Sequence, residues 1–186
     1  SKDVYISLNH VMEYYIYAYY FKPETDVKCT ELPYHEYYRT YGDLCMQLEK
    51  FHGAESAYKK SLKWNPVDLD TILALAESYK YMNKLQKYLD TTKQAYRYCC
   101  TRATMARYYR NMGYYYLSEY KPDIARACYV YSNIYYKTDN ADAELKYLEE
   151  ALKDKTPDLT IPEMQKIFAD NGIEPGPQSD TIGVVY

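Results

Sequence analysis

Residues 109–129, YRNMGYYYLSEYKPDIARACY, hold the pattern that decides the fold. A large residue, Tyr109, comes three positions before Met112-Gly113, and a ring follows at Tyr116. The same pattern occurs in residues 38–58, YRTYGDLCMQLEKFHGAESAY, and in residues 72–92, ILALAESYKYMNKLQKYLDTT. In each copy a second set of residues begins twelve positions after the small residue, in the pairs Gly42 and Ala54, Ala76 and Tyr88, and Gly113 and Ala125.

This spacing resembles the tetratricopeptide repeat, a helix hairpin of about 34 residues. Gly42 and Ala76 are 34 residues apart, and Ala76 and Gly113 are 37 apart. The resemblance implies an all-α fold, a right-handed superhelical array of antiparallel helix hairpins. Such a hairpin cannot bury its apolar face alone, so neighbouring hairpins stack and form a concave groove.

The helix pattern predicts the organisation of the chain. A helix over residues 3–21 and a loop occupy residues 1–34. Three repeats follow, at residues 35–68, 69–105 and 106–136, and a capping helix pair at 137–171. The last segment, 172–186, is predicted to be an extended tail because Ile182, Val184 and Val185 are β-prone. Three placements of the tail remain open: disordered, in the chain's own groove, or on a neighbouring molecule.

The small residues predict where the helices of a hairpin approach each other. Gly42 of the first helix is expected to meet Ala54 of the second, with the rings of Tyr41 and Tyr58 at the sides. The second repeat has Tyr88 where the family pattern has a small residue and Thr92 where it has a ring. Its two helices are therefore expected to splay or shift.

Composition excludes several classes of protein. The chain has 186 residues, a net charge of -3 and 28 tyrosines against 3 phenylalanines, so tyrosine supplies most of its aromatic volume. Five cysteines in a chain of this size favour reduced thiols and a cytoplasmic location over a secreted disulfide scaffold. A disulfide between adjacent Cys99 and Cys100 is the alternative. No run is apolar enough to predict a membrane span, since the best candidate, residues 4–21, contains Asn9, His10 and Glu13.

Catalysis and metal binding have little support in the sequence. The histidines are His10, His35 and His52, and His10 with Glu13 lacks a second recognisable ligand pair. No phosphate-binding loop or nucleophile motif is present. We therefore predict that the protein is not an enzyme and has no cofactor and no metal.

The family resemblance implies that the first helix of each hairpin lines the groove. Carried over position by position, the groove residues that we predict to bind a partner are Arg39, Asp43, Glu77, Tyr81, Arg107, Arg110, Asn111 and Tyr114, with Glu36 and Asp70 beside them. Some members of the family bind chaperone carboxylates through a clamp of Lys, Asn and Arg. Here the asparagine sites of the clamp are Asp43 and Ala74, so recognition of a chaperone's terminal carboxylate is not expected.

One charge pattern leaves two kinds of partner open. Residues 91–118 contain no acidic residue but five basic ones, interleaved with tyrosines. Arginine suits carboxylate and phosphate groups, so an acidic peptide or protein is the favoured partner. Basic residues with stacking rings also suit single-stranded nucleic acid or another anionic ligand, through the stretch Lys93 to Arg110. Nucleic acid is less expected because the chain is acidic overall. Pairing of these cations with acids elsewhere in the chain is the third interpretation.

Overall fold

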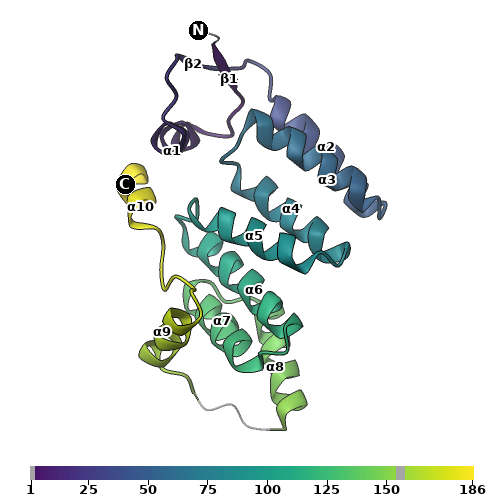
Figure 1. Ribbon diagram of the computed structural model, residues 1–186, viewed down its shortest axis with the longest axis vertical. Coiled ribbons are helices and arrows are strands. Elements are labelled where there is room, and N and C mark those ends of the chain that lie inside the picture. Colours follow the sequence, from purple (N-terminus) through teal and green to yellow (C-terminus); the bar gives the residue numbers. More distant parts are fainter. Residues whose placement is uncertain (1–2, 154–157) are drawn as a thin grey trace. The chain divides into compact units, whose positions relative to one another are not determined.

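The computed structural model describes residues 3–153 and 158–186. It confirms the all-α repeat fold: antiparallel helix hairpins follow one another along the chain, and Figure 1 labels them in order. The chain divides into two compact units, Ser1–Tyr98 with Ser179–Tyr186, and Cys99–Gln178. We describe each unit by itself. The repeat boundaries proposed from the sequence remain a prediction.

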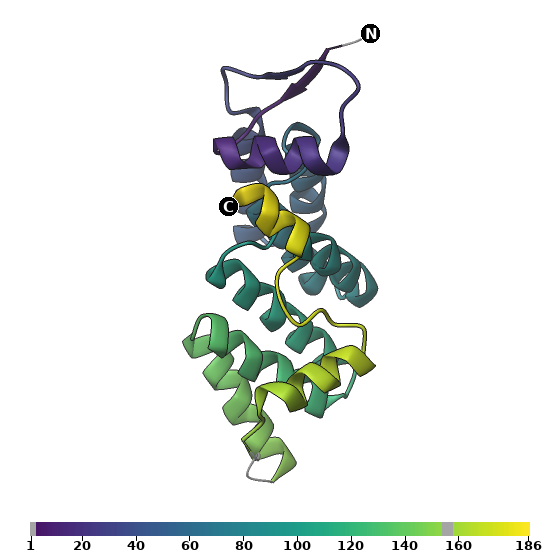
Figure 2. The same cartoon turned by 90° about the vertical axis from the view of Figure 1, so that its left-hand side faces the viewer.

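The first unit contains two hairpins, a small sheet and two further helices. The hairpins are α2 (Tyr34–Gln47) with α3 (Phe51–Trp64), and α4 (Leu69–Tyr81) with α5 (Leu85–Tyr96). Strands β1 (Val4–Ile6) and β2 (Val27–Cys29) pair in parallel, and α1 (Val11–Phe21) lies between them in sequence. Helix α10 (Ser179–Val185) returns to pack against α1, as Figure 2 shows.

The start of the chain corrects one prediction. The expected helix over residues 3–21 begins only at Val11, because the residues before it pair with β2 and Ser7 N–H donates to the Trp64 carbonyl at 2.9 Å. Within α1, Ile16 and Tyr17 are buried, whereas Tyr15 and Tyr19 are exposed.

A buried polar network fixes this first segment on the α2–α3 hairpin. Ser7 Oγ lies 2.7 Å from Nδ1 of His35, whose Nε2 lies 2.8 Å from Asn9 Oδ1. Asn65 Nδ2 donates to Glu13 Oε2 at 2.8 Å, and the Asn9 backbone N–H donates to the same carboxylate oxygen at 2.7 Å. Polar groups are buried at little free-energy cost only when they are hydrogen-bonded. Each hydrogen bond of this network therefore stabilises the buried position of its neighbours.

The tail corrects a second prediction. Residues 179–185 are helical rather than extended, and they dock on their own chain. Thr181 is fully buried, and its hydroxyl donates to the Arg97 carbonyl and lies 2.5 Å from Tyr20 Oη. Val184 and Val185 pack against the core cluster of the first unit. A seven-residue helix has too little intrinsic stability to form alone, so these tertiary contacts decide its structure.

Gly42 makes room for a ring in the first hairpin. A Cβ atom at Gly42 would lie 2.5 Å from Cε1 of Tyr58, and the three atoms nearest to it all belong to that ring, which was predicted to lie at the side of the contact. Tyr41, expected to fill the side of the contact, is 60% exposed. In the second hairpin Tyr88 and Thr92 are both buried, and α4 contacts α5 less extensively than α2 contacts α3.

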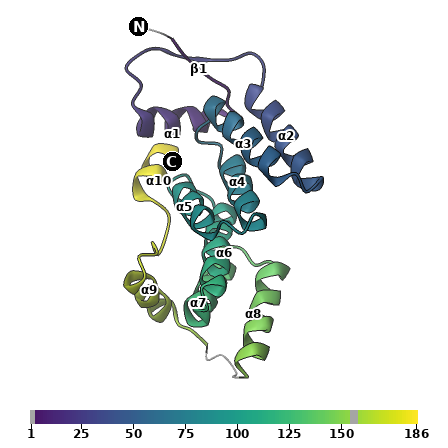
Figure 3. The ribbon, with the colours of Figure 1, turned by 45° about the vertical axis from the view of Figure 1, so that its right-hand side comes forward.

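The second unit contains the hairpin of α6 (Arg102–Ser118) and α7 (Pro122–Tyr135), followed by α8 (Asp139–Leu152) and α9 (Ile161–Asp170). Pro122 occupies the first turn of α7, where a missing N–H costs little, and Thr160 forms a capping box with Glu163 at the start of α9. The proposed capping pair does not form a hairpin like the others. Helices α8 and α9 both pack on α7, from opposite sides (Figure 3).

Candidate functional site

The predicted groove residues are divided between the two units. Arg39 and Asp43 lie on α2, and Glu77 and Tyr81 lie on α4, all in the first unit. The remaining four, Arg107, Arg110, Asn111 and Tyr114, lie on α6 in the second unit. Each group of four therefore lies on one or two helices of a single unit, and we describe the two groups one after the other.

On α2 the two charged residues already have partners within the fold. Arg39 Nη1 lies 3.9 Å from Oδ2 of Asp68, whose side chain is only 3% exposed. Burial raises the pKa of Asp68, while the hydroxyl of Thr71 donates to its carboxylate at 2.6 Å and opposes that rise. Arg39 is itself one-third exposed, so it can neutralise Asp68 and still present N–H groups to a ligand.

Asp43 is exposed, but it also has a structural role. Its Oδ1 accepts a hydrogen bond from the Tyr58 hydroxyl at 2.7 Å, so the carboxylate holds the ring that Gly42 accommodates. Burial and this hydrogen bond both raise the pKa of Tyr58, which keeps the hydroxyl protonated as the donor. A substitution at Asp43 would therefore change packing as well as surface charge.

On α4 the two predicted residues lie on accessible surface. Glu77 forms a 3.6 Å ion pair with Lys80 one turn away, and its side chain is 40% exposed. Tyr81 is 58% exposed and stacks on Phe51, with ring centroids 5.3 Å apart and planes 8° apart. A tyrosine held flat by a neighbouring ring loses little conformational entropy on binding, which suits it as an anchor.

On α6 the structure reveals a feature that the sequence did not predict. Arg107 and Arg110 lie one turn apart, and Nη1 of Arg110 is buried with no hydrogen-bond partner among the described residues. Burial lowers the pKa of the Arg110 guanidinium, and the like charge of Arg107 lowers it further. A bound carboxylate or phosphate would supply the missing acceptor and the missing charge. Asn111 and Tyr114, both half-buried, flank this position and already interact with other residues of the chain.

The rest of the basic stretch is largely used by the fold. Arg102 donates to the backbone carbonyls of Tyr135 and Ile134 at 2.9 and 2.8 Å, and the Arg97 guanidinium lies 5.6 Å from the ring centroid of Tyr20. The rings that stacking on bases would need are mostly buried, namely Tyr98, Tyr108, Tyr109 and Tyr116. Stacking on bases requires exposed ring faces.

Comparisons with known proteins agree on the fold. The first tetratricopeptide domain of Spaghetti (RPAP3), solved bound to an HSP90 peptide SRMEEVD, matches 65% of this chain and 94% of that chain with a TM-score of 0.57 and 17% identity. The fold is that of a tetratricopeptide repeat array. The Sgt2 tetratricopeptide domain from Aspergillus fumigatus matches 69% of this chain and 90% of that chain, with a TM-score of 0.56 and 12% identity. No family model matches the sequence, and no curated protein matches it.

Tyrosine hydroxyls in this tetratricopeptide fold have a role that the sequence did not indicate. In the second unit, three of them donate to the backbone that follows α9: Tyr116 to Asn171 at 3.2 Å, Tyr109 to Glu174 at 2.6 Å and Tyr131 to Pro175 at 2.7 Å. Their rings meanwhile pack in the core, around Phe168 for Tyr109 and Tyr131. Phenylalanine would fill the same volume but leave these carbonyls without donors, which gives a physical reason for tyrosine at these positions.

The described residues contain no group of three or more potential metal ligands, and none of their helices has the length and hydropathy of a membrane span. His35 is buried in the polar network, whereas His10 and His52 are exposed. All five cysteines are free thiols. Burial raises the pKa of Cys99 to about 12, helped by its neighbour Cys100, so this thiol is protonated near neutral pH and a poor nucleophile.

Proposed function

We propose that this protein is a protein-interaction scaffold in which α6, the first helix of its third hairpin, binds an acidic peptide or protein segment. The observation that carries the proposal is the buried, unpaired Nη1 of Arg110 beside Arg107. Buried charges in native proteins are normally paired, so a half-buried guanidinium without an ion pair among the described residues favours an anionic partner at its accessible side. We place this scaffold in the cytoplasm and assign it no catalytic role.

The chemistry of α2 limits which acidic partner fits. The RPAP3 domain was solved with an HSP90 peptide, but this chain has Asp43 and Ala74 at the asparagine sites of the family's carboxylate clamp. A carboxylate at Asp43 repels a terminal carboxylate instead of donating to it. We therefore expect the peptide SRMEEVD to bind much more weakly than the protein's own partner.

Single-stranded nucleic acid is the less favoured alternative. It would need several exposed rings beside the basic residues, and the rings near Arg107 are mainly in the core. A fluorescent oligonucleotide distinguishes the two partners, because nucleic-acid binding weakens steeply and linearly in log–log form as salt is added.

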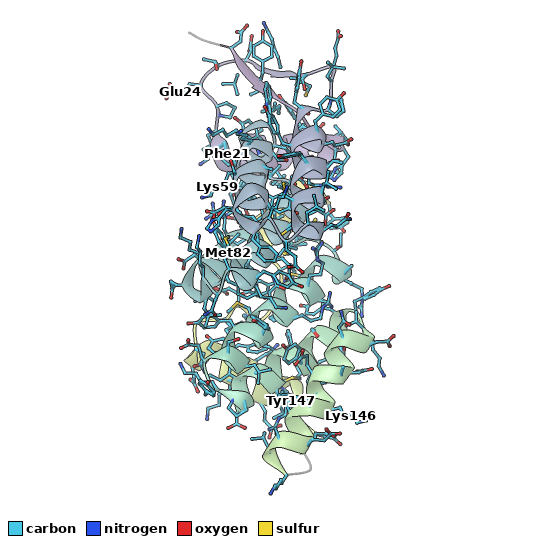
Figure 4. All side chains as sticks on the ribbon, turned by 90° about the vertical axis from the view of Figure 1, so that its right-hand side faces the viewer. Phe21, Glu24, Lys59, Met82, Lys146 and Tyr147 are labelled. Atoms are coloured by element: carbon cyan, nitrogen blue, oxygen red, sulfur yellow. The ribbon has the colours of Figure 1, made fainter. Side chains whose placement is uncertain are left out.

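The test is affinity capture from the native cell extract with three versions of the protein. These are the wild type, the Arg107→Glu/Arg110→Glu variant, and Lys146→Glu as a matched charge reversal on α8, where Lys146 is 77% exposed (Figure 4). We expect the wild type and Lys146→Glu to retain the same partners and the double variant to lose them. Equal capture by all three proteins would refute α6 as the binding surface.

A further inference from the structure

Helix α2 and its C-cap residue Leu48 expose a stripe of large apolar side chains. Tyr37, Tyr41, Leu44 and Leu48 are 55%, 60%, 50% and 56% exposed. They recur at intervals of four, three and four residues, so they lie in one row along the helix. A continuous apolar row on a helix surface is normally covered by another element.

The second hairpin shows what covers the corresponding row. Thirty-four residues further on, α4 has Thr71, Leu75 and Ser78, which are 0%, 7% and 0% exposed. The fourth equivalent residue, Met82, is half-buried, and α3 of the preceding hairpin packs on α4. This face of a first helix is therefore shaped to receive another helix, and within the described residues α2 has none there.

A groove lies beside the stripe. It has a volume of about 470 Å³ and is lined by Tyr37, Tyr38, Tyr41, Gly53, Ser56, Ala57 and Lys60. Its lining combines the tyrosines of α2 with small residues of α3. A protruding row of side chains can enter such a groove as ridges enter grooves between helices.

We propose that this stripe is the interface of a symmetric dimer, in which α2 of a second copy packs antiparallel across it. The intervals of four, three and four read the same in both directions, so an antiparallel copy stays in register. Tyr37 then meets Leu48 of the second copy, and Tyr41 meets its Leu44. Each large ring faces a smaller side chain, as a self-complementary two-fold contact requires.

The charges around the stripe also fit a second copy. Thr40 and Gln47, which border the stripe on α2, are uncharged, whereas the register sets Glu49 of each copy opposite the exposed Glu36 of the other. Glu49 lies at the Leu48 end, and Lys60 lies at the other end with its Nζ 6.0 Å from the Tyr38 ring centroid. Neither forms an ion pair within the described part of the chain. In the antiparallel arrangement we expect Lys60, a cation near the Tyr37 end of the stripe, to pair with Glu49 of the other copy and to offset its repulsion from Glu36.

The surface area that two copies would bury indicates the affinity of this dimer. Taking ~200 Å² for a fully exposed tyrosine, the four side chains expose on the order of 400 Å² per copy. With the groove walls the two copies bury about 1,000 Å², the lower end for a specific interface. The dimer is therefore weak and concentration-dependent. It is independent of the proposed peptide site, because Arg39 and Asp43 lie on another side of α2 and Arg110 lies on α6.

Sedimentation velocity of the full chain from about 1 μM to about 1 mM tests the dimer. We expect the mass to rise from the monomer value of 22.1 kDa toward twice that value. Leu44→Asp and Tyr41→Asp should each raise the dissociation constant by more than about 30-fold, because an unpaired charge would enter the centre of the contact. Tyr147→Asp on α8 is the matched control: Tyr147 is 58% exposed, and its substitution should leave the dimer intact (Figure 4).

A charge exchange tests the register. Lys60→Glu should weaken the dimer, and the double variant Lys60→Glu/Glu49→Lys should recover most of the wild-type affinity because both ion pairs re-form in reverse. Far-UV circular dichroism should be the same for all variants, since every changed side chain is exposed. A monomer throughout the concentration range, or a dimer that Leu44→Asp does not weaken, overturns the proposal. A dimer that responds to Leu44→Asp but not to the charge exchange overturns the antiparallel register.

Discussion

Gly42→Ala is the sharpest test of how the hairpins pack. A methyl group at Gly42 would lie 2.5 Å from Cε1 and 2.7 Å from Cδ1 of Tyr58, whereas carbon atoms pack comfortably at about 3.5–4.0 Å. The ring cannot yield easily. It is 1% exposed, and its hydroxyl is bonded to Asp43. The ring or the whole helix must therefore move by about 1 Å.

The magnitude follows from two opposing effects. Overpacking of this kind costs about 1–3 kcal/mol, and so close a contact belongs at the upper end of that range. Alanine is the better helix former by about 1 kcal/mol, which offsets part of the cost. We expect Gly42→Ala to lower the free energy of unfolding by about 2 kcal/mol. Helix propensity alone predicts that Gly42→Ala stabilises the protein. The sign of the measured change therefore shows whether propensity or overpacking dominates.

Urea unfolding, monitored by tryptophan fluorescence, measures this change in the free energy of unfolding at the hairpin itself. Trp64 is the only tryptophan of the chain, and it stacks on Tyr34 of the same hairpin with ring centroids 4.7 Å apart. A double-mutant cycle isolates the contact. In a Tyr58→Ala background, kept folded with sucrose, Gly42→Ala should be neutral or stabilising because the ring is gone. Gly183→Ala, with nothing within 4 Å, is the control. Equal costs in both backgrounds would show that the ring is not what the glycine accommodates.

Three further substitutions test other parts of the structure. Gly113→Leu places its Cβ 2.9 Å from the Tyr129 ring and should lower the thermal midpoint of the helical signal; an unchanged melt contradicts the packing. Burial works to raise the pKa of Glu55, but Lys59 and then Lys84 outweigh it and hold the pKa at about 2 against an ordinary 4.5. Because the folded pKa is lower, the wild type should lose stability as pH falls from 4.5 towards 2, and Glu55→Gln should lose less over that window; parallel urea titrations at each pH would disprove this. Thr181→Val removes the hydroxyl that binds α10 to the first unit, so amide exchange in α10 should accelerate, and unchanged protection would mean that the valines alone hold it.

The repeat spacing predicted the hairpins well because helix pairs impose a strict period on small and large residues. It did not predict that the atoms nearest to Gly42 belong to the ring of Tyr58, and the geometry of helices explains why. Side chains on a helix point towards its N-terminus, so the ring of Tyr58 reaches back by about one turn, to the level of Ala54. The small residue at Ala54 is real and fully buried, but the space at Gly42 belongs to the ring.

The two ends of the chain could not be predicted from their own residues. Val4–Ile6 is a strand only because Val27–Cys29 lies beside it, and Ser179–Val185 is a helix that docks on α1. Segments of three to seven residues have weak local preferences, and tertiary contacts override them. The β-prone composition of residues 181–186 was therefore a poor guide to their structure.

The candidate sites also depend on tertiary contacts that the local sequence does not specify. The periodicity placed Arg110 on an accessible face of α6, but burial of its Nη1 depends on neighbours that no local pattern specifies. The same applies to the two apolar rows at Tyr41 and Leu75, which occupy equivalent repeat positions. Leu75 is buried because a preceding hairpin covers α4, and Tyr41 is 60% exposed because none of the described residues covers α2. A repeat pattern predicts which face can be covered, and only the structure shows whether it is.

Helix α2 therefore has two faces with different chemistry. One carries Arg39 and Asp43, whose charges are tied to Asp68 and Tyr58, and the other carries the apolar stripe. A dimer through the stripe would leave the charged face of each copy accessible, so one assembly would present two peptide sites. Two linked sites bind a partner with two acidic segments more tightly than either site alone, without any new contact. Leu44→Asp should then reduce affinity for such a partner while leaving affinity for a single segment unchanged, an outcome that a purely structural role for the stripe does not produce.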